Sequence, residues 1–501
     1  MATCKYVFVQ AVEMIMYAKF INKLRLIGKL TPLLTTLIII LLTIAPQYTQ
    51  AQKLYATDVA KAHQQIINLN YNKQASAAAP WISGYALFVD ALTTTRKIDT
   101  DSIIQQLSEF IKQQKKFSSN NYTKLFISDL YLMKSYLHLI SNSNLYASTS
   151  YFWAYQAINS VTDWQRDRFR LFQLAIDAQL QNIAPLLAEN RTTEERLSLF
   201  RQILNDINTN SEVPPTFKDE VRLLSLILLP LVGDNGELAY TLCCEYGTEW
   251  IESSVTKSYI SANCMQRALQ HDRALATMLT ASKKGENTHF NQVNLFIGCS
   301  LLNQLSDSCV IFLNKFISLQ TNKANVEYAK LKLAWYYFIN NNSDAAQQLV
   351  AEIVKQKPIT ANDKQAVYEC RHSNTWNIDL LKARLMFDAS KYEASQLLLN
   401  KISNQLFQLS PLQVNEYWYR LGRVCHLNGQ YAKAKEAYAK AIDNNLATQL
   451  YYPCYAAYYL GCIYKLENNI AEANKYFNIC IKTESPIYKS SITQKAKMAL
   501  Q

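Results

Sequence analysis

The sequence predicts an all-α protein, folded as a right-handed α-solenoid of helical hairpins. Three observations lead to this expectation. Gly and Pro are scarce, at 10 and 11 of 501 residues, so long helical patterns run with few breaks. No stretch alternates between apolar and polar residues and then ends in a hairpin dipeptide, as a strand would. Finally, one helical pattern occurs twice between Trp418 and Cys480.

The two copies of this pattern place matching residues at identical intervals. The first comprises Trp418, Leu421, Gly422, Cys425, Gly429, Tyr431, Ala434, Tyr438 and Ala441, and the second Ala457, Leu460, Gly461, Tyr464, Asn468, Ile470, Ala473, Phe477 and Cys480. We expect Gly422 and Ala434 to face each other across one hairpin, because small side chains let helix axes approach to about 8–10 Å. Gly429 lies in the predicted turn, where a residue with a Cβ would be strained.

The pattern predicts individual helices in the second half of the chain. Glu416–Leu427 and Ala432–Ile442 are the two helices of the first copy, since their apolar residues recur at helical spacing. Weaker copies keep the same intervals in Tyr328–Val354 and Trp376–Ile402. The period from Gly422 to Gly461 is 39 residues, and the excess over the usual repeat is expected around Asn444–Pro453.

These residues resemble the tetratricopeptide repeat, a helical hairpin that stacks into solenoids. The chain also resembles a set of exported, largely uncharacterised tetratricopeptide repeat proteins of Bacteroidota. The strings that carry this likeness are Leu380–Asp388, Tyr419–Arg423 and Tyr488–Ala499. The resemblance implies a solenoid and an exported location. It implies no reaction and no particular ligand.

The first 51 residues are predicted to be a signal peptide. Lys19, Lys23, Arg25 and Lys29 precede the apolar run Leu33–Ala45, and Thr49-Gln50-Ala51 offers a cleavage site after Ala51. A segment of this length is short for a membrane span, although it would act as an anchor if it were retained. We therefore expect an exported protein, in the periplasm or cell envelope of a Gram-negative bacterium.

The rest of the chain is expected to form two regions. Residues 52–310 are predicted to be an irregular helical-repeat region, and residues 311–501 a regular tetratricopeptide region that ends in a capping helix. The formal net charge is +12, but no run of five or more Lys or Arg occurs, so a nucleic-acid partner is not expected.

A search for catalytic chemistry finds none of the common motifs, such as His-Glu-x-x-His, Gly-x-Ser-x-Gly or a glycine-rich phosphate loop. The six His are scattered, and the 11 Cys include no Cys-x-x-Cys pair. Neither a cofactor nor a metal is expected, and the protein is predicted not to be an enzyme. Disulfides stay open, with Cys243, Cys244, Cys264, Cys299 and Cys309 as candidates.

The sequence predicts a scaffold that binds a protein or peptide client on the concave face of the solenoid. First-helix positions that do not face the second helix should be exposed there, and Tyr and Arg often dominate binding energy. The candidate contact residues are Tyr419, Arg423, His426, Tyr455, Tyr458 and Lys465. The alternative function is a glycan-capturing accessory of an outer-membrane uptake system. An enzyme on an all-α frame is less favoured.

Overall fold

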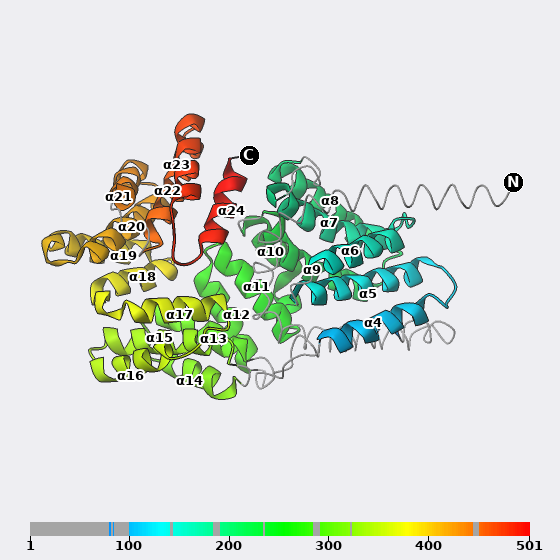
Figure 1. The fold of residues 1–501 in the computed structure, drawn as a ribbon, viewed down its shortest axis with the longest axis horizontal. Coiled ribbons are helices and arrows are strands. Elements are labelled where there is room, and N and C mark those ends of the chain that lie inside the picture. The colour runs from blue at the N-terminus through cyan, green and yellow to red at the C-terminus, as the bar shows by residue number, and fades with distance from the viewer. Residues whose placement is uncertain are drawn as a thin grey trace. The chain divides into compact units, whose positions relative to one another are not determined.

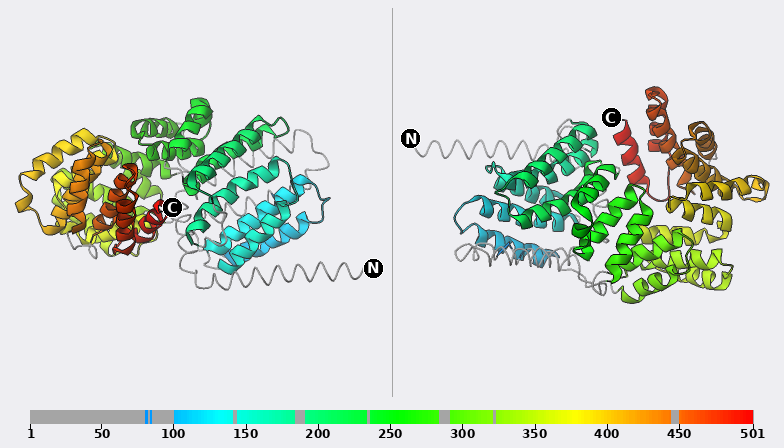
Figure 2. Two further views of the ribbon diagram at one scale, coloured as in Figure 1. Left: turned by 90° about the horizontal axis from the view of Figure 1, so that it is seen from above. Right: turned by 180° about the vertical axis from the view of Figure 1, so that it is seen from behind.

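The computed structural model describes residues 80, 81, 84, 100–140, 144–183, 191–233, 236–283, 291–320, 323–443 and 450–500. Throughout those ranges the chain forms α-helices, two short 3-10 helices and connecting turns, and no strand (Figures 1 and 2). The all-α prediction is thus confirmed. The segment expected to be a signal peptide lies outside the described residues. Among the residues described, no helix is long and apolar enough to cross a membrane.

The chain divides into two compact units, the first ending at Val221 apart from Leu231–Gly233. Its described helices are α4 (Thr100–Gln114), α5 (Asn121–Ile140), α6 (Asn144–Ile158), α7 (Trp164–Ile183), α8 (Thr193–Thr209) and the first part of α9 (Pro215–Val232). Inside it, Arg168 bridges two buried carboxylates, at 3.0 Å from Asp129 and 2.6 Å from Glu220. The indole of Trp81 also donates to Asp129. Buried charges persist only when they are paired in this way.

The second unit holds nearly all residues from Arg222 onward. Its helices are α10 (Glu237–Glu252), α11 (Val255–Arg267), α12 (His271–Lys283), α13 (Gln292–Asn303), α14 (Cys309–Leu319), α15 (Val326–Ile339), α16 (Ser343–Val354), α17 (Ala361–Arg371), α18 (Ile378–Asp388), α19 (Tyr392–Ser403), α20 (Pro411–Leu427), α21 (Tyr431–Asp443), α22 (Tyr452–Leu466), α23 (Ile470–Lys482) and α24 (Lys489–Ala499). Successive helices pack in antiparallel pairs.

Six of these pairs share one turn geometry. Each first helix ends in a left-handed residue, with φ between 58° and 71°, at Leu269, Leu305, Asn341, Ser390, Gly429 and Asn468. The next backbone N–H then donates to a carbonyl five residues earlier, as from Gln430 to Cys425. This bond satisfies a carbonyl that the helix end leaves free, and it reverses the chain. The hairpins are α11/α12, α13/α14, α15/α16, α18/α19, α20/α21 and α22/α23.

A small residue precedes each of these turns by seven positions: Ala262, Gly298, Ala334, Ala383, Gly422 and Gly461. The hairpins therefore share one register; α11/α12 lies before residue 310, and α13/α14 spans it. The part expected to be irregular thus contains one regular hairpin and the first helix of another, and the expected boundary near residue 310 falls inside the repeating run. Sequence reading missed these two because Leu269 and Leu305 give no turn signal, although they are left-handed.

None of the ten cysteines after residue 51 forms a disulfide. The disulfide candidates that the sequence left open lie in helices, and Cys243, Cys264 and Cys309 are buried. Cys454 Sγ on α22 and Cys480 Sγ on α23 lie 3.6 Å apart. These buried cysteines behave as small apolar groups in the hairpin core.

Candidate functional site

The candidate site lies on what we call the first-helix layer, formed by the first helices α13, α15, α18, α20 and α22 of successive hairpins. Each of these helices contacts the next one along the layer, and α22 in turn contacts α24. The second helix of each hairpin contacts the first helix of the same hairpin more than it contacts the second helices of other hairpins. The first-helix layer therefore brings side chains from distant parts of the sequence together.

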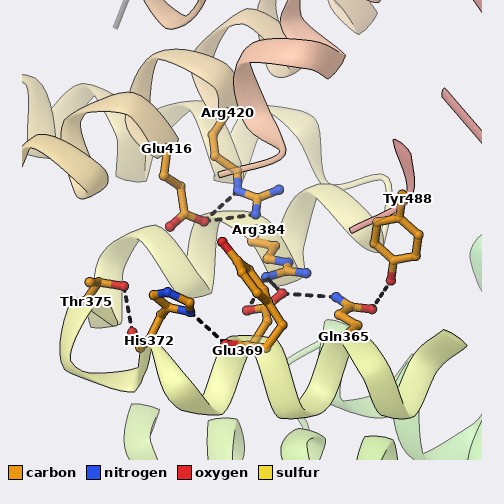
Figure 3. A network of polar contacts seen from close by, with 9 residues as sticks. Gln365, Glu369, His372, Thr375, Arg384, Glu416, Arg420 and Tyr488 are labelled. Carbon is orange, nitrogen blue, oxygen red and sulfur yellow. Dashed lines mark hydrogen bonds and ion pairs between the residues drawn. The ribbon is translucent and has the colours of Figure 1, made fainter. Parts of the chain in front are cut away.

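A polar network crosses this layer (Figure 3). Nη1 of Arg384 on α18 donates to both carboxylate oxygens of Glu369 on α17, at 2.9 and 3.1 Å, and so forms an ion pair. Gln365 donates from its amide to Glu369 at 3.0 Å, and its carbonyl oxygen accepts from the Tyr488 hydroxyl. Burial alone would raise the pKa of Glu369, but Arg384 and these hydrogen bonds hold that pKa below its usual value. Glu369 is therefore the charged centre of the network.

Lys332 on α15 sits close to the same network. Its side chain is buried, and its ammonium lies 3.9 Å from the ring centroid of Trp335 and 4.8 Å from that of Tyr328. Arg384 faces the same indole at 4.5 Å. Burial lowers the pKa of Lys332 to about 8. A buried amine held by ring faces costs stability, and such groups concentrate at functional sites.

Two further arginines continue the layer on α20. Arg420 pairs with Glu416 one turn earlier, at 2.9 Å, and faces the ring of Tyr452. Arg423 lies 3.7 Å from the ring centroid of Tyr459 and forms no ion pair with any described residue. Its charge is thus balanced by an aromatic face and not by a carboxylate, which leaves it suited to an acidic partner.

The structure corrects one expected position. Tyr419, predicted to be exposed, is only 6% exposed and stacks on Tyr452 with ring centroids 5.1 Å apart. The physical reason is that neighbouring first helices pack against each other, so a side chain that turns away from its own second helix still meets a neighbour.

The other predicted contact residues have different surroundings. Arg423 is half-buried, and so is His426, whose ring Nδ1 lies 3.3 Å from the Tyr438 hydroxyl. Tyr455 and Tyr458 are also half-buried on α22, whereas Lys465 at the end of that helix is exposed. These five residues are placed where a partner can reach part of each side chain, and their role in binding stays a prediction.

Sequence reasoning missed the polar network. Gln365 and Glu369 are on α17, a helix inserted between two hairpins, and Tyr488 follows the last hairpin. No local pattern joins them, because Tyr488 and Gln365 are 123 positions apart. The one available signal was the 49-residue interval from Ala334 to Ala383, which is long enough to hold an extra helix.

Within the described residues, no group of three or more His, Cys, Asp or Glu is arranged to hold a metal ion. The polar residues of the network bind one another, and the arrangement places cations and aromatic rings along one layer. Such a layer supports recognition through ion pairs, hydrogen bonds and ring contacts.

Comparison with known proteins identifies one repeat. A family model described as tetratricopeptide repeat matches residues 415–445, which include most of α20 and all of α21. A search of curated proteins gives no match. The chain is therefore a helical-repeat solenoid with a tetratricopeptide repeat in its second unit, and its likeness to proteins of Bacteroidota stays a prediction.

Solved structures with similar helical arrays include human IFIT1. The human IFIT1 dimer with m7Gppp-AAAA is 13% identical, covers 77% of this chain and 96% of that chain, and has a TM-score of 0.31. A monomeric IFIT1 mutant with Gppp-AAAA is 11% identical, covers 82% of this chain and 89% of that chain, and has a TM-score of 0.31. At that TM-score, the ligand of IFIT1 indicates nothing about a ligand of this chain.

Proposed function

We propose that this chain is a non-catalytic scaffold that binds a protein or peptide client on its first-helix layer. Helical repeats of this type generally mediate protein interactions. The observation that carries the proposal is the half-buried Arg423, held over the ring of Tyr459 without a carboxylate partner in the described chain. Arginine and tyrosine in this arrangement are the residues that most often dominate binding energy at protein interfaces.

We further propose that the scaffold is exported and works in the periplasm or cell envelope of a Gram-negative bacterium. The support is the charged, apolar and small-residue order of the first 51 residues. Fractionation of cells that express the full chain, followed by mass spectrometry of its N-terminus, tests this. Protein retained in the cytoplasm with residues 1–51 intact would refute it.

The binding proposal is tested with a double variant, Arg423→Gln with Tyr458→Ala. Its matched control is Lys433→Gln with Tyr476→Ala, which removes a cation and a tyrosine from the second helices α21 and α23. Proteins captured from the cell envelope are identified by mass spectrometry and then purified for direct titration. We expect the site variant to weaken client binding by at least about tenfold, equivalent to roughly 1.4 kcal/mol, and the control to leave it unchanged.

Equal client affinity for wild type and site variant would refute this location of the site. Retention on a polysaccharide array without any protein client would instead favour the glycan-capturing alternative. In that case the aromatic rings of Tyr455, Tyr458 and Tyr459 become the residues to replace.

A further inference from the structure

The last helix of the chain lies on the residues predicted to bind the client. Lys465 donates from Nζ to the backbone oxygen of Ala499, at 2.8 Å, at the end of α24. Ile492 and Ala496 of α24 are buried in a cluster against which Tyr455 and Tyr458 pack. The surface proposed for the client is thus already occupied in part by this chain's own helix.

The connection before α24 is also held by contacts with α17 and with the residue that precedes α22. Tyr488 has a left-handed backbone, with φ of 59°, a conformation that costs a residue with a Cβ about 1–2 kcal/mol. Its ring meets the ring of Tyr451 edge-on, and its hydroxyl donates to Gln365. The contacts of the side chain therefore hold the backbone in a strained conformation.

Lys489 anchors the start of α24 by donating to the backbone oxygens of Cys480 and Ile481, whereas the middle of the helix meets like charges. The helix Lys489–Ala499 carries three lysines and no acidic residue. The Lys495 side chain keeps contact with solvent, but partial desolvation of its ammonium, and then the positive charges of Arg267 on α11 and Arg423 on α20, lower its pKa. Lys495 thus lies near two arginines, whereas Lys465 stabilises the end of α24 through its bond to Ala499. Like charges at a contact weaken it.

The helix α24 also buries few apolar side chains against its neighbours. Of its side chains whose burial is described, only Ile492 and Ala496 are buried. By comparison, α22 buries eight residues. Elements with few buried apolar contacts open locally at low free energy, well before the protein unfolds. Release of α24 would uncover Tyr455, Tyr458 and Lys465 without disturbing the hairpins beneath.

We propose that α24 is a displaceable self-ligand, and that an acidic amphipathic helix of the client replaces it on α20 and α22. The proposal deepens and rests on the client-binding function given above, because it names the chemistry of the client. Apolar residues at positions i and i+4 of the client fill the places of Ile492 and Ala496. A carboxylate in the place of Lys495 meets Arg267 and Arg423 as counter-ions, so an ion pair replaces a repulsion.

The first test changes the charge of α24 within the full chain. Lys495→Glu is compared with Lys433→Glu, a charge reversal at an exposed position of α21. Hydrogen exchange read by mass spectrometry reports the protection of residues 489–499. We expect wild-type α24 to exchange faster than α22 and α23, and Lys495→Glu to slow that exchange by about tenfold while Lys433→Glu leaves it unchanged. Equal protection of α24 and α22 in the wild type, or no slowing in Lys495→Glu, would overturn the proposal.

The second test supplies the helix as a separate peptide. The probes are labelled peptides of residues 484–500, one with the native sequence and one with Lys495→Glu and Lys497→Glu. The receptor is the full chain with Ile492→Asp, which places a charge at a position 1% exposed and so undocks α24. Binding is measured by fluorescence anisotropy. We expect the acidic peptide to bind the Ile492→Asp variant about tenfold more tightly than the native peptide binds it. We also expect the acidic peptide to bind wild type less tightly than it binds the variant.

Added salt should weaken binding of the acidic peptide more than that of the native one. Equal affinity of the two peptides, or equal binding to wild type and variant, would overturn the proposal. The hydrogen-exchange test does not use the Ile492→Asp variant. It can therefore still refute the proposal if that variant fails to fold.

The client itself separates this inference from the function on which it rests. If client binding needs Arg423 and Tyr458 but is equal for wild type and Ile492→Asp, the scaffold function stands and displacement of α24 is wrong. If the client binds regardless of Arg423 and Tyr458, the proposed location of the site is wrong, whatever the peptides do.

Discussion

Gly422 and Tyr438 are in such close contact that the glycine cannot carry a side chain. A Cβ at position 422 would lie 2.5 Å from Cδ1 and 2.6 Å from Cε1 of the tyrosine ring, and Tyr438 is completely buried. Gly461 and Phe477 repeat this relationship in the next hairpin, with both ring atoms at 2.7 Å. In these two hairpins the contact sets how closely the first and second helices approach.

Gly422→Ala should therefore destabilise the second unit. Overpacking of a filled core costs typically about 1–3 kcal/mol, and the Tyr438 ring is completely buried. The measurement is the midpoint of urea unfolding. Gly429→Ala is the matched control, because its Cβ would meet no atom within 4 Å and the cost there comes only from φ of 71°. A smaller loss for Gly422→Ala than for Gly429→Ala would contradict the contact.

Protonation of His426 should lower the stability of the fold in mild acid. Burial, and then the positive charge of Arg423, lower the pKa of His426 to about 4 from its ordinary 6.5. The unfolded chain therefore binds the proton first, and stability falls as the pH drops from 6.5 towards 4. One pKa unit corresponds to about 1.36 kcal/mol, so the loss is at most about 3 kcal/mol and less with solvent screening.

The rings around His426 are those of Tyr431, Tyr438 and Tyr459. In His426→Phe this part of the acid dependence should vanish, whereas Tyr431→Phe should keep it. The measurement is the slope of the unfolding free energy against pH. The slope is used because each substitution also changes the unfolding free energy itself at every pH. An unchanged slope in His426→Phe would show that the imidazole is not confined as the structure indicates.

Removal of Glu369 should be among the most damaging single changes in the second unit. Glu369→Gln leaves the buried Arg384 without its counter-ion, and breaking a buried pair from one side costs about 3–5 kcal/mol. Glu436→Gln is the control, because its pair with Lys440 lies on the surface and contributes little that can be measured. Similar unfolding midpoints for the two variants would refute the central place of this pair.

Acid also acts on Glu369, with a sign fixed by its lowered pKa. A carboxyl whose folded-state pKa is depressed stabilises the fold above its unfolded pKa, ordinarily 4.5, and loses this contribution as the pH falls through the folded value. Wild type should therefore lose stability below about pH 4.5 more steeply than Glu369→Gln. Calorimetric melting across that range measures the difference.

The buried triad of the first unit offers an independent test. Arg168→Met leaves Asp129 and Glu220 buried without their cation and should cost about 3–5 kcal/mol, whereas Asp129→Asn keeps one pair and should cost less. Burial, opposed by Arg168 and aided by Glu220, raises the pKa of Asp129. Its contribution therefore falls as the pH rises above 3.8 through the folded value, and Asp129→Asn should remove this fall. A larger loss from Asp129→Asn than from Arg168→Met would contradict the shared role of the arginine.

The hairpins could be predicted because their cause is local. Gly422 and Ala434, or Gly461 and Ala473, are 12 positions apart and meet through a short turn, so a sequence pattern records the contact directly. The same reasoning found the helices around Ala334 and Ala383. It missed α11/α12 and α13/α14, whose turns place leucines in a conformation normally given to glycine.

The sequence by itself determined that the chain is helical, where the last four hairpins lie and which residues face each other inside them. Those features depend on side chains within one hairpin, where helical periodicity fixes direction. Only the tertiary structure decided that Tyr419 is buried, that Arg384 pairs with Glu369, and that Tyr488 reaches Gln365. These relationships depend on the angle at which successive hairpins stack. That angle is the sum of many small packing contacts, and no interval in the sequence records it.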